Sequence, residues 1–237
     1  MSANGPGTAG QPPHDASVLP GEPLPVQLMN TVRADAGGVG DFLRTTGDLR
    51  AWLAAIAPRL PGGIGSTLAD PGARPASARE PRGPAASPSE DGELAALLPE
   101  FRRLRDALRA LAAAATHDSR PAALAGPPDV AAASADVDRA CALAPSWSRL
   151  SWPEGGTPVR TLSSAHSPAA AALSLVAEDA ARLFAGDDRH ALRACLAPGC
   201  VLYFLGTHPR RAWCSAGCGN RARVARHYQR HHARPGG

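Results

Sequence analysis

Hydrophobic positions recur at helical spacing over much of the first 187 residues. Between residues 93 and 116 an apolar side chain returns every third or fourth position, which is the period of a helix with one buried face. The same spacing predicts two short helices within residues 24–56, on either side of a loop at 36–40. A Pro-Pro dipeptide precedes a further helical run at 129–144. These patterns predict a mostly helical domain.

Local start and turn signals add two elements to this domain. Ser167 is a predicted N-cap, and Pro168 is suited to the first position of a helix that continues through Phe184. Before this helix, apolar residues between Trp147 and Leu162 flank a Pro-Glu-Gly-Gly turn, which predicts a short β-hairpin packed on the helices. The predicted fold class is mainly α, with a multihelical N-terminal domain that includes a short β-hairpin.

Composition divides the chain further. Residues 1–22 are rich in Gly, Pro and Ala without periodicity and predict a disordered leader before a helical domain at 23–187. Within that domain, residues 58–92 repeat Pro, Gly, Ser and Arg and predict a flexible insertion. Residues 188–237 form the remaining unit. No basic segment followed by an apolar stretch opens the chain, and no apolar run is long enough for a bilayer, so we expect a cytoplasmic protein without membrane contact.

Charge is distributed unevenly along the chain. All 25 basic residues are Arg, and residues 195–237 contain seven of them without any Asp or Glu. Such a basic segment is typical of a module that faces polyanions, and a solvated basic terminus is the alternative. The helical domain contains no phosphate-binding loop, nucleophile elbow or helical His pair around a Glu. We therefore expect a protein that is not an enzyme.

Four of the five cysteines form a C-x4-C-x13-C-x3-C pattern near the C-terminus. Pro198, Gly199 and Gly217 lie in the short loops within the two pairs, where such residues let two thiolates face one ion. A β-prone run at 201–205 lies between the pairs, and a turn near His208 can lead it back toward Trp213. The pattern predicts a small four-cysteine zinc knuckle with one structural zinc, bound by Cys195, Cys200, Cys214 and Cys218.

Other thiol chemistries remain as alternatives to zinc. Two disulfides require an oxidising compartment, and a catalytic dithiol generally has the C-x-x-C spacing, which is absent here. Four thiolates can also hold an iron–sulfur cluster, although the spacing matches the known cluster motifs poorly. Four cysteines close a zinc site without an open coordination position, which disfavours catalytic zinc.

A basic helix is predicted after Cys218. At about 100° per residue, Val224 and Tyr228 share one side of it, and an Arg stripe occupies the opposite side. We expect Val224 and Tyr228 to pack on the knuckle beside Trp213, and the stripe to meet phosphates or base edges of double-stranded DNA. The candidate nucleic-acid-binding residues are Arg210, Arg211, Asn220, Arg221, Arg223, Arg226 and Arg230. For Asn220 and Arg221, which lie against the metal loop, a backbone-capping role is an equal alternative to a base contact.

The segment from Trp213 through the Cys-Gly-Asn-Arg core at 218–221 resembles the CGNR zinc finger, and the Cys195-x4-Cys200 pair fits the same pattern. In that family the finger follows a helical ABATE domain of stress-induced transcription regulators, common in actinobacteria. Residues 24–32 and 48–53 resemble the opening of that domain. The resemblance implies a zinc-dependent, DNA-binding transcription regulator whose helical domain senses a signal or pairs subunits.

Two other functions fit the same residues. A basic zinc protein can bind RNA, in which case single-stranded bases need exposed aromatic side chains for stacking. The finger can also dock a protein partner through its Arg stripe, as part of an interaction scaffold. The sequence leaves open whether the chain forms a homodimer, which DNA sequence it recognises, and whether a small-molecule effector exists.

Overall fold

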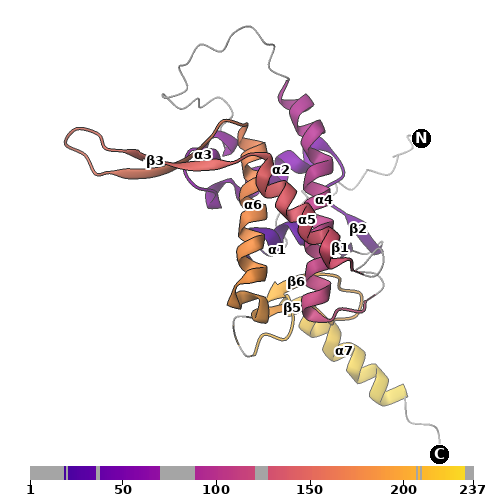
Figure 1. Ribbon diagram of the computed structural model, residues 1–237. Coiled ribbons are helices and arrows are strands. Elements are labelled where there is room, and N and C mark those ends of the chain that lie inside the picture. The colour runs from indigo at the N-terminus through magenta and orange to yellow at the C-terminus, as the bar shows by residue number, and fades with distance from the viewer. Residues whose placement is uncertain are drawn as a thin grey trace, which may run out of the picture.

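The computed structural model describes residues 19, 21–35, 38–69, 89–120, 128–206, 208 and 210–232. Most of the predicted leader, and residues 70–88 of the predicted insertion, lie outside this part of the chain. Helices make up the body of the molecule, and the C-terminal helix extends from its lower end (Figure 1).

The helices, in chain order, are α1 (Leu24–Met29), α2 (Thr46–Ile56), α3 (Ile64–Ala69), α4 (Glu90–Thr116), α5 (Val130–Leu143), α6 (Pro168–Ala185) and α7 (Ala216–His232). Two 3-10 turns are η1 (Ala57–Arg59) and η3 (Asp187–Ala191). The strands are β1 (Val32–Asp35), β2 (Gly38–Asp41), β3 (Ser146–Ser151), β4 (Val159–Ser164), β5 (Leu192–Ala194) and β6 (Tyr203–Leu205). They form three antiparallel pairs, β1–β2, β3–β4 and β5–β6.

The long helix α4 confirms the strongest periodic pattern of the sequence. It begins three residues before the expected position because the Ser89 side chain caps it, accepting a hydrogen bond from Gly92 N at 3.2 Å. Acidic side chains in its first turn stabilise the helix, because their negative charge lies near the positive end of the helix dipole. Phe101, Leu104 and Leu108 lie on its buried face, so the predicted apolar stripe is the face that contacts the core.

The helix α6 lies at the centre of the core, in contact with α1, α4 and α5. It begins as predicted, because the Ser167 hydroxyl accepts a hydrogen bond from Ala170 N at 3.2 Å and Pro168 occupies the first turn. Its small side chains, mostly Ala, let α5 pack closely. The Ser174 hydroxyl then bonds the end of α5, accepting from Ala144 N at 2.9 Å and donating to Ala140 O at 2.8 Å.

Three local expectations differ from the structure. A hairpin, β1–β2, replaces most of the loop expected at 36–40. The predicted insertion is partly ordered, because its first residues form α3 and bury Leu60 and Ile64 in the core. Gly65 permits this packing, since a Cβ there would clash with the carbonyl oxygen of Ala57. The Pro- and Gly-rich composition therefore hides a short packed segment.

The β3–β4 hairpin is the third difference. The sequence pattern predicts that it packs on the helices, but it projects from the body (Figure 1). Trp147 is 51% exposed and Trp152 is 72% exposed. Leu162, near the base of β4, packs against the core, whereas the positions farther along the hairpin lie beyond the helices. Alternating apolar residues identify the strands, but they do not show whether other elements pack against the hairpin.

A partly buried ion pair joins the β1–β2 hairpin to α4. Arg105 is 4% exposed, and its Nη1 donates to Asp41 Oδ1 at 2.7 Å. Burial alone would raise the pKa of Asp41, but the hydrogen bonds from Arg105 and Leu43 N lower it below the ordinary value of 3.8. The ionised carboxylate is therefore stabilised in the folded state.

We expect Asp41→Asn to lower the free energy of unfolding by about 1 to 2 kcal/mol at neutral pH, because Arg105 loses a charged acceptor. The folded-state pKa of Asp41 lies below the unfolded value, so its contribution is complete above about pH 4 and is lost as the pH falls through the folded pKa. Urea unfolding of both proteins at pH 7 and pH 3 measures the difference. An equal difference at both pH values would contradict this assignment.

Candidate metal centre

The first two cysteines lie at the turn of the β5–β6 hairpin. Cys195 directly follows β5, and its backbone N donates to Leu202 O at 3.0 Å. Cys200 N donates to Ala197 O at 2.9 Å, and Gly199 has a φ of +73°, which favours glycine. The β-prone run at 201–205 thus pairs with the strand before Cys195, whereas the sequence suggests a return toward Trp213.

The second pair lies at the beginning of α7. Cys214 precedes the helix and Cys218 lies in its first turn, where the Ser215 hydroxyl accepts a hydrogen bond from Cys218 N at 3.2 Å. Gly219 follows, and a Cβ at this position would lie 3.1 Å from Cδ1 of Trp213. The glycine therefore lets the indole lie close to the helix beside the cysteines.

The four thiols form one compact cluster. All are buried, and their sulfur atoms lie within 4.8 Å of one another. The Sγ atoms of Cys200 and Cys214 are 3.8 Å apart, and those of Cys214 and Cys218 are 3.3 Å apart. Zinc–sulfur bonds of about 2.3 Å in a tetrahedron separate the sulfurs by about 3.8 Å. These separations exceed a disulfide bond of about 2.05 Å, and all four cysteines are free thiols. The cluster fits one structural zinc.

The electrostatics of the cluster also favour a cation. Hydrogen bonds from the thiols of Cys200 and Cys214 lower the pKa of Cys195. The same contact with Cys195 raises the pKa values of Cys200 and Cys214. The sulfurs can therefore share one negative charge by exchanging hydrogen bonds, but four buried thiolates require a positive ion among them. Zn²⁺ meets this requirement with the coordination number that the cluster offers.

Arg221 supports one of the ligands directly. Its Nη2 donates a hydrogen bond to Sγ of Cys218 at 3.0 Å, and this bond raises the pKa of Arg221. Four thiolates on Zn²⁺ carry a net charge of about −2, which a guanidinium beside them partly offsets. The sequence leaves two roles open for Arg221, a base contact and a capping role at the metal loop, and the structure places its guanidinium on a metal ligand.

We expect Arg221→Gln to weaken zinc affinity by about 10- to 100-fold, the usual effect of losing a hydrogen bond to a metal ligand. Competition for zinc with a chromogenic chelator measures the change. Arg223→Gln is the matched control, because Arg223 is exposed on the same helix and makes no ion pair among the described residues. Equal affinities of the two variants would show that Arg221 does not support the site.

Arg211 joins the finger to the beginning of the helical domain. Its Nη2 lies 2.7 Å from Oε1 of Glu22 and donates to Cys214 O at 3.2 Å. Its Nη1 donates to Leu205 O at 3.0 Å, and the guanidinium lies over the Phe204 ring. The other oxygen of Glu22, Oε2, accepts from Leu205 N at 2.8 Å. This second candidate nucleic-acid contact is therefore engaged within the protein.

Two further buried contacts hold β6 against the helices. The Asn30 side chain accepts from Tyr203 N and donates to Tyr203 O, both at 2.9 Å, as a strand neighbour would. Arg109 is 4% exposed and donates to Met29 O at 2.9 Å and to Val201 O at 3.2 Å. Neither residue stands out in the sequence, because a single Asn or Arg within a helical pattern carries no local sign of a distant partner.

A third contact reaches the metal-binding turn itself. Nη1 of Arg120, just after α4, donates to Cys195 O at 2.7 Å and to Cys200 O at 2.8 Å. Asp118 holds this arginine through an ion pair of 2.6 Å and also accepts from the Tyr203 hydroxyl at 2.7 Å. The carbonyl groups beside two predicted zinc ligands are thus fixed by the helical domain.

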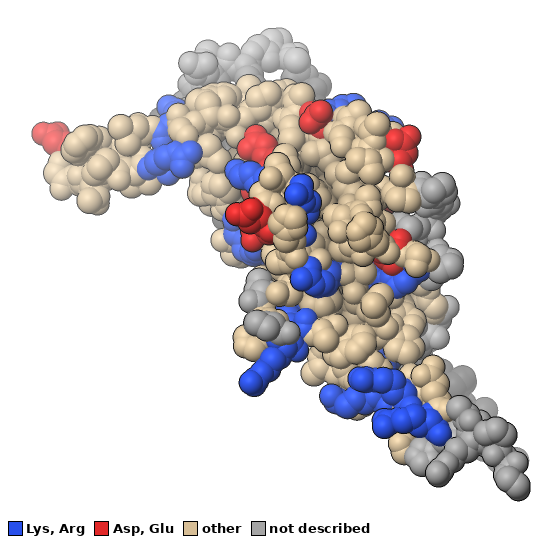
Figure 2. Space-filling model, turned by 60° about the horizontal axis from the view of Figure 1, so that its bottom comes forward, with Lys and Arg blue, Asp and Glu red and all other residues tan. Residues whose placement is uncertain are grey.

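The remaining candidate residues lie at the surface. Arg210, Asn220, Arg223, Arg226 and Arg230 are exposed. Figure 2 shows basic residues gathered at the lower end of the molecule, while the acidic residues on this face lie on its upper part. Among the described residues, none of these four arginines forms an ion pair. The stripe on α7 therefore carries positive charge that no carboxylate of the described residues pairs with.

The expected packing of α7 is wrong in one respect. Val224 is 46% exposed and Tyr228 is 59% exposed, so neither packs on the knuckle. The buried residues of α7 are Cys218, Gly219 and Ala222, all in its first two turns. The knuckle is too small to cover a 17-residue helix, and most of α7 extends into solvent (Figure 1).

Two family models match the chain. Residues 22–187 match the ABATE model, described as a putative stress-induced transcription regulator, and residues 191–231 match the CGNR zinc finger. Together the matches cover the helices around the core and the four clustered cysteines. No curated protein matches the chain. Within the described ranges, no helix has the length and apolar character needed to cross a membrane.

Proposed function

Since the chain belongs to the ABATE family of putative stress-induced transcription regulators and carries a CGNR zinc finger, we propose that it is a zinc-dependent DNA-binding regulator of transcription. In this proposal the protein is cytoplasmic and not an enzyme, and it acts in a stress response. The helical domain then receives a signal or pairs two subunits as a homodimer.

The exposed Arg stripe on α7 carries this proposal. The helix is about 25 Å long and about 10 to 12 Å wide, which suits a major groove about 12 Å wide. Residues 223, 224 and 226–230 of this helix are exposed, and most of α7 extends away from the body (Figure 1), so both flanks can approach a duplex. Arg223, Arg226 and Arg230 are the proposed phosphate or base contacts, with Arg210 and Asn220 beside them.

Two of the seven candidate residues have a different role in this proposal. Arg221 and Arg211 hold the metal ligand Cys218 and the carbonyl group of Cys214, respectively. They fix the angle at which α7 leaves the body. Their replacement would therefore disturb DNA binding through the geometry of the finger.

Fluorescence anisotropy with labelled duplex DNA of random sequence tests the proposal. The zinc-loaded protein is expected to bind at about 50 mM salt and to lose affinity steeply by about 200 mM, because binding releases counterions from the phosphates. Removal of zinc with a chelator is expected to abolish binding. A zinc-loaded protein without measurable affinity at low salt would contradict the proposal.

An RNA-binding function is a second candidate, because Tyr228 exposes an aromatic ring on the same helix as the stripe. An exposed ring can stack on an unpaired base. Competition between duplex DNA and single-stranded RNA of equal length separates the two candidates. Preference for duplex DNA, unchanged in Tyr228→Ala, supports the regulator. Preference for RNA that is lost in Tyr228→Ala supports the alternative.

A further inference from the structure

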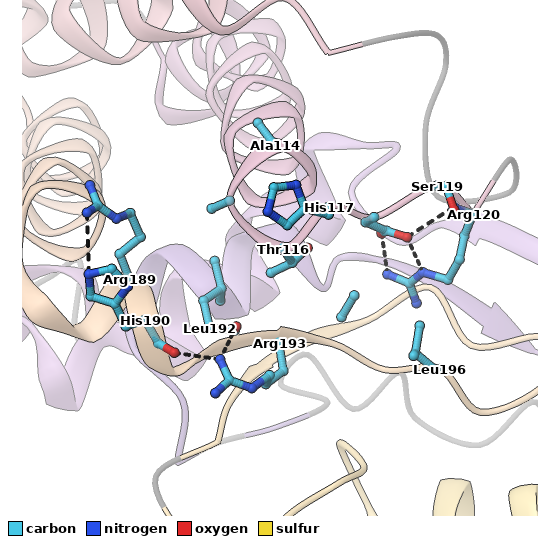
Figure 3. A pocket seen from close by; sticks show the side chains of 13 residues that line it. Ala114, Thr116, His117, Ser119, Arg120, Arg189, His190, Leu192, Arg193 and Leu196 are labelled. Carbon is cyan, nitrogen blue, oxygen red and sulfur yellow. Dashed lines mark hydrogen bonds and ion pairs between the residues drawn. The ribbon is translucent and has the colours of Figure 1, made fainter.

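A pocket of about 740 Å³ lies where the helical domain meets the finger. One wall is the C-terminal end of α4 with the residues after it, including His117 and Arg120. The opposite wall is the segment from η3 through β5, which leads to Cys195 (Figure 3). The volume is that of a typical small-molecule site. Residues from the helical domain and from the finger therefore line one open pocket.

The pocket carries positive charge that is not neutralised. Arg189 and Arg193 line it, and among the described residues neither forms an ion pair. Asp118 carries the one carboxylate among the lining residues, and it is paired with Arg120. His117 and His190 add two imidazoles to the lining. An anion entering the pocket would therefore meet excess positive charge.

Both arginines are held in place by backbone carbonyl groups. Nη1 of Arg193 donates to His190 O at 2.6 Å and to Leu192 O at 2.8 Å, as Figure 3 shows. Nη1 of Arg189 donates to Phe184 O at 3.2 Å, and its Nη2 lies 3.4 Å from Nε2 of His190. Both side chains are exposed, and these bonds restrict them, which reduces the freedom that each loses on binding a carboxylate, sulfonate or phosphate group.

Part of the lining is apolar, beside the hydroxyl groups of Thr116 and Ser119. Ala114, Ala115, Leu192 and Ala194 form part of the walls, and Leu196 contributes a large side chain that is 69% exposed. A bare phosphate of nucleic acid would leave this surface in water. An anion with an apolar body would cover it, and the burial of apolar surface would add to the affinity. The lining therefore favours a small amphipathic molecule.

We propose that this pocket binds a small organic anion, with its charged group at Arg193 and its apolar body against Leu192 and Leu196, while the Arg189 guanidinium on the other side of the His190 ring adds positive charge to the lining (Figure 3). Arg120 links the site to the metal centre, because it lines the pocket and donates to the carbonyl groups of Cys195 and Cys200. A bound anion would join the end of α4 to the segment before the knuckle. Regulation of DNA binding through this link rests on the proposed function, whereas binding of the anion to the pocket does not.

Anilinonaphthalene sulfonate is a suitable probe, because it combines an anionic group with an aromatic body. Its fluorescence is titrated with the full-length, zinc-loaded protein in the absence of DNA. The double variant Arg189→Gln/Arg193→Gln is expected to bind the probe at least about tenfold more weakly, because it loses charged hydrogen bonds to the anion. Circular dichroism and zinc content establish that the variant is folded.

Arg149→Gln/Arg160→Gln is the matched control. It removes the same charge from the β3–β4 hairpin, where exposed Trp side chains can also attract the probe. Unchanged affinity in this control, together with the loss in the pocket variant, supports the proposal. An equal loss in both variants, or no loss in the pocket variant, would overturn it.

Leu196→Ser separates an organic anion from a nucleic-acid phosphate. Weaker probe binding in this variant supports the small organic anion, because the apolar wall then contributes to affinity. Unchanged probe binding overturns the proposal and leaves a surface that recognises charge alone, as a phosphate backbone contact would. Because DNA is absent throughout, failure of this proposal is distinguishable from failure of the proposed DNA binding.

Discussion

Cys214→Ser is expected to abolish stoichiometric zinc binding and to unfold the finger. The Cys214 sulfur contacts those of both Cys200 and Cys218, so its loss opens the cluster at its centre. A structural zinc with four thiolates supplies about 10 to 16 kcal/mol of apparent folding energy in isolated fingers. Elemental analysis measures the metal per chain, and amide hydrogen exchange measures protection from β5 to α7. Both are expected to fall together.

Cys141→Ser is the control for this experiment. Cys141 is half-buried on α5, outside the cluster, and its replacement is expected to leave one zinc per chain. The core between α4 and α6 is expected to stay protected in Cys214→Ser, although Tyr203 and Leu205 of β6 belong to that core and lose their support. Full zinc content with normal protection of the finger in Cys214→Ser would refute the metal assignment.

Replacement of Arg223, Arg226 and Arg230 by Gln is expected to weaken duplex DNA binding by about 100-fold at low salt. Each arginine that contacts phosphate contributes about 1 to the slope of log affinity against log salt, so the slope should fall by about 3. Anisotropy titrations at several salt concentrations give both quantities. The side chains lie on exposed turns of α7, so zinc content and folding should not change.

A second triple variant, Arg149→Gln/Arg160→Gln/Arg182→Gln, controls for net charge. These arginines are exposed on the β3–β4 hairpin and on α6. The control is expected to retain most of the affinity and the full salt slope. A similar loss in both variants would indicate that net charge, and not the stripe, attracts DNA.

The metal centre was predictable because its determinants are local. Two thiols separated by three or four residues share a turn, and glycine lets the backbone make that turn. The helix α4 was predictable for a similar reason, since residues close together in the sequence determine both its capping serine and its buried face. Both conclusions needed no knowledge of distant contacts.

The docking of the finger was not predictable in the same way. Asn30 bonds the backbone of Tyr203, 173 positions away, and Arg120 bonds the turn that holds Cys195 and Cys200. Only the folded chain brings such partners together. Val224 and Tyr228 show a second limit of local patterns. Periodicity places them on one face of α7, but it does not show whether another part of the protein covers that face, and both side chains are exposed.

Because α7 is attached by its first two turns alone, a small rotation at its attached end produces a large displacement at its free end. Arg230 lies twelve residues beyond Cys218, which corresponds to about 18 Å along the helix axis. A tilt of about 10° at the cysteines would displace this arginine by about 3 Å, close to the rise of about 3.4 Å between successive base pairs. In the proposed complex with DNA, small adjustments at the metal would thus shift the far end of the helix by a distance close to one base-pair step.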